Sequence, residues 1–109
     1  MPLYESVIIC RQDITKNQLD QIISDFKDHL ISEKGNILHE EYWGLRNLAY
    51  EINKNKKGHY NMLIIEIMAD KISEYERRLR LHEDIVRFMT IKIKKYEEKN
   101  SIMLDNQSE

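Results

Sequence analysis

The chain has 109 residues, of which 41% are hydrophobic, and its formal net charge is -2. That length and hydrophobic content suit one domain with one modest core. A charge so close to neutral argues against a protein that coats polyanions indiscriminately, because such coating needs a broadly basic surface. No window holds the roughly twenty apolar residues of a membrane span, and the N-terminus lacks the build of a signal peptide. We therefore expect a cytoplasmic protein with no membrane partner.

The basic residues are nevertheless segregated along the chain. Residues 44–95 hold 12 Lys and Arg against 7 Asp and Glu, whereas the remaining residues hold 5 against 12. Ordinary solvated helices also produce such segregation, so the signal is weak by itself. It indicates where an anionic partner would bind if there is one.

A buried strand and an amphipathic helix are predicted first. Residues 3–11 are apolar without a helical period, which indicates a central strand. Cys10, the only cysteine, cannot form a disulfide within the chain, and we expect it to be a small buried hydrophobe. Thr15 and Gln18 form a capping box that starts a helix. Gly35 is placed to adopt the left-handed conformation that stops it. The apolar stripe of this helix is Leu19, Ile22, Ile23, Phe26 and Leu30.

The middle of the chain predicts a hairpin with a cationic tip. Residues 36–50 read as a long strand that is bulged or bent at Gly44. Residues 53–59 form a polar loop with three lysines, closed by glycine. Residues 60–68 are apolar on both alternations, as in an interior strand.

A second helix and a fourth strand complete the predicted domain. Asp70 or Ser73 can cap the helix, and residues 85–95 alternate as a strand again. One face of the helix carries Ile72, Tyr75, Leu79 and His82. The order of elements predicts an α+β fold, the ferredoxin-like βαββαβ sandwich, with a four-stranded antiparallel sheet and both helices on one face. We expect one domain over residues 1–95 and a disordered tail over residues 96–109.

Catalytic and metal chemistry find little support in the sequence. The four histidines and the cysteine have no spacing suited to zinc, and no glycine-rich loop opens a helix. The loop after the first strand lacks glycine and contains Asp13, which would repel a phosphate. We expect no enzyme activity, no cofactor and no small-molecule substrate.

The residues from Gly44 to Ile52 carry a recognisable signature. It consists of the glycine, Arg46 two positions on, the triplet Leu48-Ala49-Tyr50, and Ile52. Similar residues fall at Tyr4-Glu5, Tyr42-Trp43, Leu79-Arg80-Leu81-His82-Glu83 and Arg87-Phe88-Met89. Over roughly residues 2–95 the chain resembles the family of the sixth protein of the bacterial small ribosomal subunit.

The resemblance implies a structural role without turnover. Members of that family bind the central domain of small-subunit ribosomal RNA together with the eighteenth small-subunit protein, so we expect the same two partners here. The residues expected to contact RNA or the partner protein are Tyr4, Trp43, Arg46, Lys54, Lys56, Lys57, Tyr60, Arg80, Arg87 and Lys92.

Two alternatives stay open at this point. Each aromatic residue can instead be half-buried packing, and each strand arginine can instead form an ion pair with a nearby carboxylate. The whole chain can instead be a regulatory or self-associating module whose sheet face binds a protein or small ligand. Salt dependence separates the two functions, because RNA binding through several cations weakens steeply with salt and an apolar interface does not.

Overall fold

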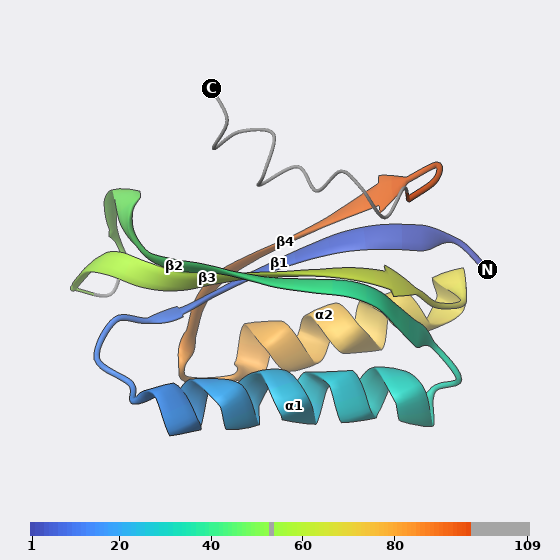
Figure 1. Ribbon diagram of the computed structural model, residues 1–109, viewed down its shortest axis with the longest axis horizontal. Helices are drawn as coiled ribbons and strands as arrows, with labels where there is room; N and C mark the ends of the chain where they lie inside the picture. Colours follow the sequence, from blue (N-terminus) through green and yellow to red (C-terminus); the bar gives the residue numbers. More distant parts are fainter. Residues whose placement is uncertain (53, 97–109) are drawn as a thin grey trace.

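The computed structural model describes residues 1–52 and 54–96, and over these ranges it has the predicted ferredoxin-like fold. Along the chain lie β1 (Leu3–Arg11), α1 (Lys16–Ser32), β2 (Asn36–Ile52), β3 (Asn55–Glu66), a 3-10 turn (Ala69–Lys71), α2 (Ile72–Leu81) and β4 (Ile85–Ile93). The strands form one antiparallel sheet in the order β2-β3-β1-β4, and both helices cover one of its faces (Figure 1). We call that side of the sheet the helix face and the opposite side the open face.

The main core lies between the helices and the helix face. Its side chains come from alternate positions of β1 and β3 and from the apolar stripes of both helices, among them Ile8, Leu63, Ile65, Leu30, Phe26, Tyr75 and Leu79. The Tyr75 hydroxyl lies 2.7 Å from Ser6 Oγ of β1, which satisfies both buried oxygens. Cys10 is buried in this core as predicted, and burial raises the pKa of its thiol to about 12, so it stays an uncharged hydrophobe.

The start of α1 is as predicted, but its end differs from the prediction. Thr15 and Gln18 make both hydrogen bonds of the capping box. At the other end Lys34, and not Gly35, has the left-handed conformation, with a φ of 65°. The Lys34 and Gly35 amides donate to Ile31 and Leu30, which is the Schellman arrangement. Glycine is needed at position 35 because an added Cβ would lie 2.9 Å from the Glu66 carbonyl oxygen.

The predicted cap of α2 is wrong. Neither Asp70 nor Ser73 caps the helix, because the 3-10 turn precedes it and its N-cap position is Lys71, with no side-chain hydrogen bond to the first turn. The turn carries the chain from β3 into the helix without a side-chain acceptor. Tyr75 and Leu79 still face the core as the periodicity predicted.

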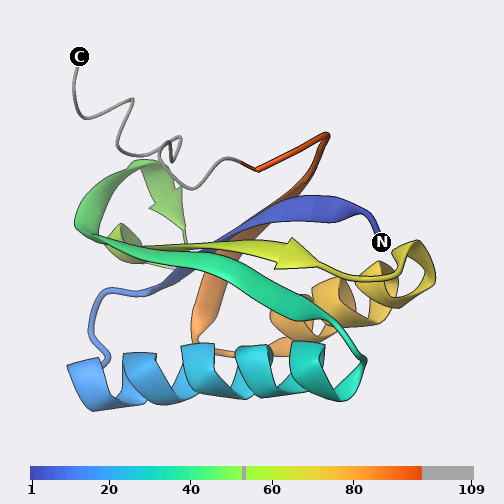
Figure 2. The ribbon, with the colours of Figure 1, turned by 45° about the vertical axis from the view of Figure 1, so that its right-hand side comes forward.

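The hairpin is bulged at Gly44 as predicted, yet its connection is shorter than predicted. The β2–β3 register shifts between Tyr42 and Gly44, where Gly44 has a φ of 93°. β3 begins at Asn55, so Lys56 and Lys57 lie on a strand and not in a loop. Figures 1 and 2 show this end of the hairpin curling away from the helices.

The expected domain boundary at residue 95 stays a prediction. Of the expected tail, residues 97–109 lie outside the described part of the chain. Its first residue, Tyr96, packs on the open face, with its ring centroid 5.5 Å from that of His39. No helix in the described ranges is long and apolar enough to cross a membrane.

Candidate nucleic-acid interface

The open face carries a second, smaller apolar cluster. Val7 and Ile9 of β1 and Met62 and Ile64 of β3 are buried in it. They are buried because the hairpin, both ends of β4 and the residue Tyr96 after it supply covering side chains, namely Trp43, Leu48, Tyr60, Val86, Ile93 and Tyr96. The open face is therefore partly covered by the sheet's own outer strands and is not a bare apolar surface.

A stacked aromatic pair lies at the bulge. The bulge inserts an extra residue next to Gly44. The centroids of the Trp43 and Tyr60 rings are 6.3 Å apart, and the ring planes are nearly parallel, at 11°. Trp43 Nε1 donates to Glu41 Oε1 at 2.9 Å, and Glu41 Oε2 lies 2.7 Å from His39 Nε2. These hydrogen bonds fix the orientation of the indole ring relative to β2.

Arg46 is attached to the same bulge. Its Nε donates to the Trp43 carbonyl oxygen at 3.0 Å, and the side chain is half-buried. This bond uses one of the five N–H donors of the guanidinium group. We also considered that Arg46 forms an ion pair with a carboxylate, but among the described residues it has no such ion pair.

Arg87 lies across the sheet from this group. Tyr60 and Arg87 both pair with Ile9, one from each side, so Gly44, Tyr60, Ile9 and Arg87 form one row across four strands. Arg87 is exposed, and its Nη1 donates to the Tyr50 hydroxyl at 3.5 Å. The curl of the hairpin thus brings β2 close to β4, the strand at the other edge of the sheet.

The lysines of the hairpin add positive charge at the same end. Lys54, Lys56 and Lys57 are all exposed. From residue 43 to residue 60 the chain has four Lys and Arg and a single acidic residue, Glu51. This excess of cations is the electrostatic feature that an anionic polymer would recognise.

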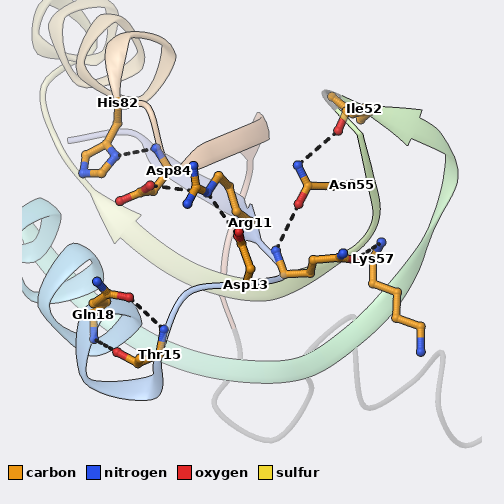
Figure 3. Close-up of polar contacts among 10 residues, drawn as sticks. Arg11, Asp13, Thr15, Gln18, Ile52, Asn55, Lys57, His82 and Asp84 are labelled. Atoms are coloured by element: carbon orange, nitrogen blue, oxygen red, sulfur yellow. Dashed lines mark hydrogen bonds and ion pairs between the residues drawn. The ribbon is translucent and has the colours of Figure 1, made fainter.

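The loops at this end of the sheet are tied together by charged groups. Arg11 Nε lies 3.3 Å from Asp13 and 3.5 Å from Asp84, and the Arg11 amide donates to the Asp84 carbonyl oxygen at 2.9 Å (Figure 3). The Asp84 amide donates in turn to His82 Nδ1. The connection after β1 is therefore fastened to the connection between α2 and β4.

The sequence did not predict that a carboxyl group would be buried on the open face. Glu5 is 4% exposed, and its Oε2 has no hydrogen-bond partner among the described residues. Burial raises the pKa of this carboxyl, and the nearby Glu41 carboxylate raises it further. The sequence signal was a glutamate inside a mostly apolar strand.

The structure brings together seven of the ten predicted site residues and separates three. Trp43, Arg46, Tyr60, Arg87 and the three hairpin lysines lie on the open face or at the end of the hairpin. Tyr4 is 7% exposed and belongs to the helix-face core, so we leave it out of the candidate surface. Arg80 lies on α2, and Lys92 lies near the far end of β4, opposite Tyr4.

Metal binding receives no support from the described residues, since no three His, Cys, Asp or Glu side chains within 1–52 and 54–96 could hold an ion. What the surface offers is hydrogen-bond donors, positive charge and one stacked aromatic pair. That inventory suits recognition of an anionic polymer.

Known proteins resemble this chain in both sequence and fold. A model of the ribosomal protein S6 family matches residues 3–92. Small ribosomal subunit protein bS6 of Rickettsia canadensis is 48% identical over 108 residues, which cover 99% of this chain and 89% of that protein. The bS6 of Granulibacter bethesdensis is 45% identical over 109 residues, which cover 100% of this chain and 71% of that protein. The crystal structure of 30S ribosomal protein S6 from Thermotoga maritima has a TM-score of 0.79 at 23% identity, covering 98% of this chain and 94% of that one.

Proposed function

This chain belongs to the ribosomal protein S6 family, and on that premise we propose that it binds the central domain of small-subunit ribosomal RNA together with the eighteenth small-subunit protein. As a structural constituent of the small ribosomal subunit it is not an enzyme, and its place is the ribosome in the cytoplasm. Membership of the family assigns the chain to the small ribosomal subunit. We propose in addition the RNA domain, the partner protein and the contact residues.

The row of Gly44, Tyr60, Ile9 and Arg87 is the observation that carries the RNA proposal. Arg87 belongs to this row, and Arg46 pairs with Gly58 two residues further along β2, on the same open face. The exposed hairpin lysines lie at the same end of the sheet. Arginine can bind a phosphate through two donors at once, and lysine supplies a point charge. Contacts of this kind read the backbone and shape of RNA, and they fit a fold whose aromatic pair is partly buried.

Apolar side chains beside these cations support a protein partner on the same face. On β4, Met89 and Ile91 pair with Val7 and Glu5 of β1, so they share a face with Arg87. Met89 is 40% exposed and Ile91 is 50% exposed. Large apolar residues gathered beside charged ones on an outer strand are typical of a protein interface. RNA and the partner protein would then bind adjoining parts of one surface.

Alanine replacement of both arginines tests the proposal. The variant R46A/R87A should bind a central-domain fragment of small-subunit ribosomal RNA, mixed with the eighteenth protein, more weakly than the parent chain. The slope of log affinity against log salt should flatten by roughly two units if each arginine neutralises one phosphate. Far-UV circular dichroism should stay the same, because Arg87 is exposed and Arg46 is not part of either core.

A matched control separates the surface from overall charge. Arg77 and Arg78 lie on α2, are exposed and both contact Glu74, so R77A/R78A removes the same charge from the helix side. Only R46A/R87A should change the slope. Equal losses in both variants, or binding that does not depend on salt, would favour the self-associating or regulatory module instead.

A further inference from the structure

The hairpin end that carries the lysines extends beyond the strand that supports it. The last β1–β3 pair is Arg11 with Gly58, whereas β3 begins three residues earlier, at Asn55. Lys56 and Lys57 therefore lie where β1 has already ended. Lys54, at the turn, has a φ of 66°, a left-handed conformation that is uncommon for a non-glycine residue. This part of β3 pairs with β2 on one side and has no β1 residue opposite it on the other.

Side-chain hydrogen bonds continue the pairing where β1 stops. Gln12, the residue after β1, accepts from the Lys57 amide through Oε1 at 3.1 Å. Its own amide donates to Asn55 Oδ1 at 3.3 Å. Asn55 Nδ2 donates to the Ile52 carbonyl oxygen at 3.2 Å, so this side chain also reaches across the turn to β2 (Figure 3). The three segments are thus joined through two amide side chains.

Asn55 is the buried member of this pair and Gln12 the exposed one. Asn55 is 7% exposed, and both ends of its amide are bonded. Because buried polar groups exchange their partners for water poorly, its hydrogen bonds order the backbone more strongly than exposed ones do. Gln12 also follows Arg11, which is bound to Asp13 and Asp84, so the support reaches the α2–β4 connection.

We propose that Asn55 and Gln12 are positioning residues, which hold the hairpin in the conformation that presents Lys54, Lys56 and Lys57 to RNA. This inference rests on the proposed function. A hairpin that is ordered before binding loses less conformational entropy when its lysines meet phosphate, so its affinity is higher for the same charges. Neither amide carries a charge, so their contribution does not depend on counterion release.

Amide hydrogen exchange in the parent chain and in variants tests the clamp without RNA. In N55A the Gln12 amide should exchange faster, and in Q12A the Lys57 amide should exchange faster. Q12E keeps an oxygen acceptor for the Lys57 amide and should restore its protection. The matched control is Q21A, since Gln21 bonds to Asp25 on α1, far from the hairpin in the chain. Unchanged amide exchange in N55A and Q12A would overturn the proposal, whatever affinity for RNA is measured.

Titration of the same variants with the central-domain RNA fragment tests the consequence. We expect N55A and Q12A to lose about 3- to 10-fold in affinity, while the slope of log affinity against log salt stays that of the parent chain. Faster exchange with unchanged affinity would overturn the positioning role alone. Failure of the parent chain to bind this RNA would overturn the proposed function, and the positioning role with it, while the exchange data would still report whether the clamp exists.

Discussion

On the helix face of the sheet, side chains from β1 and β3 are covered by two helices. On the open face their immediate neighbours are covered, within the described residues, by side chains of the hairpin, of both ends of β4 and of Tyr96. Leu63 and Ile65 belong to the first core, whereas Met62 and Ile64 belong to the second. Successive residues of a strand point to opposite faces, so one strand serves both. The comparison teaches that the large core is closed off by helices, while the small cluster lies among the side chains that we propose to contact RNA and the partner protein.

Each face also holds a buried group that titrates, and the two respond to pH in opposite directions. Burial lowers the pKa of His29 on α1, with Arg78 adding to the effect, so folding is weakened as pH falls through the ordinary histidine range. Burial raises the pKa of Glu5 on the open face, so folding is weakened as pH rises. The helix side of the protein therefore disfavours a positive charge on His29, whereas the open face disfavours a negative charge on Glu5.

The largest effect should come from removing a side chain of the main core. Leu79 of α2 is completely buried, so L79A should lower the free energy of unfolding by about 2–5 kcal/mol. L48A on the open face should cost less, because Leu48 is only half-buried there. Urea unfolding followed by circular dichroism measures both. Equal losses would mean that the two clusters support the fold equally, and the distinction drawn between them would be wrong.

The second prediction sharpens the comparison through charge. Replacing Lys54, Lys56 and Lys57 with glutamine should flatten the slope of log RNA affinity against log salt by up to roughly three units, and leave the free energy of unfolding within about 0.5 kcal/mol of the parent value. Glutamine at Lys16, Lys27 and Lys71 on the helix side removes the same charge and should leave the slope unchanged. If the slope stays the same in the hairpin variant, those lysines are only solvated.

The smallest effect concerns the buried carboxyl of Glu5. Its pKa in the folded protein is raised, so the folded state holds the proton more tightly than the unfolded state. The resulting loss of folding stability is absent when pH is below the ordinary pKa of 4.5, and it is complete once pH exceeds the raised pKa. E5Q should therefore raise the thermal midpoint near neutral pH and leave it almost unchanged in acid.

Glu51 offers the control for this prediction, because it is an exposed glutamate on β2. E51Q removes one negative charge without removing a buried one, so its midpoint should follow that of the parent chain at both pH values. A rise of the same size in E5Q and E51Q would assign the effect to net charge. No rise in E5Q would show that the Glu5 carboxylate is stabilised in the folded protein.

Local patterns in the sequence predicted most of the elements correctly. The apolar stripe and the capping box of Thr15 and Gln18 start α1, and alternation over residues 85–95 gives β4, because these features depend on residues close in the chain. Gly44 marked the bulge for the same reason, since its missing Cβ permits the left-handed conformation. The signature around Arg46 resembled the family to which the chain belongs.

Which face of the sheet each side chain occupies was decided only by the tertiary structure. Alternation assigns Tyr4 and Glu5 to opposite faces of β1 but does not say which face the helices cover, and so Tyr4 was expected at the surface and lies in the core. The start of β3 at Asn55 and the bond from Gln12 to Asn55, 43 residues apart, depend on strand register. By itself the sequence determined the elements, their order and the family, whereas the partners of each residue across strands came from register, helix placement and the bend of the hairpin, which are properties of the whole chain.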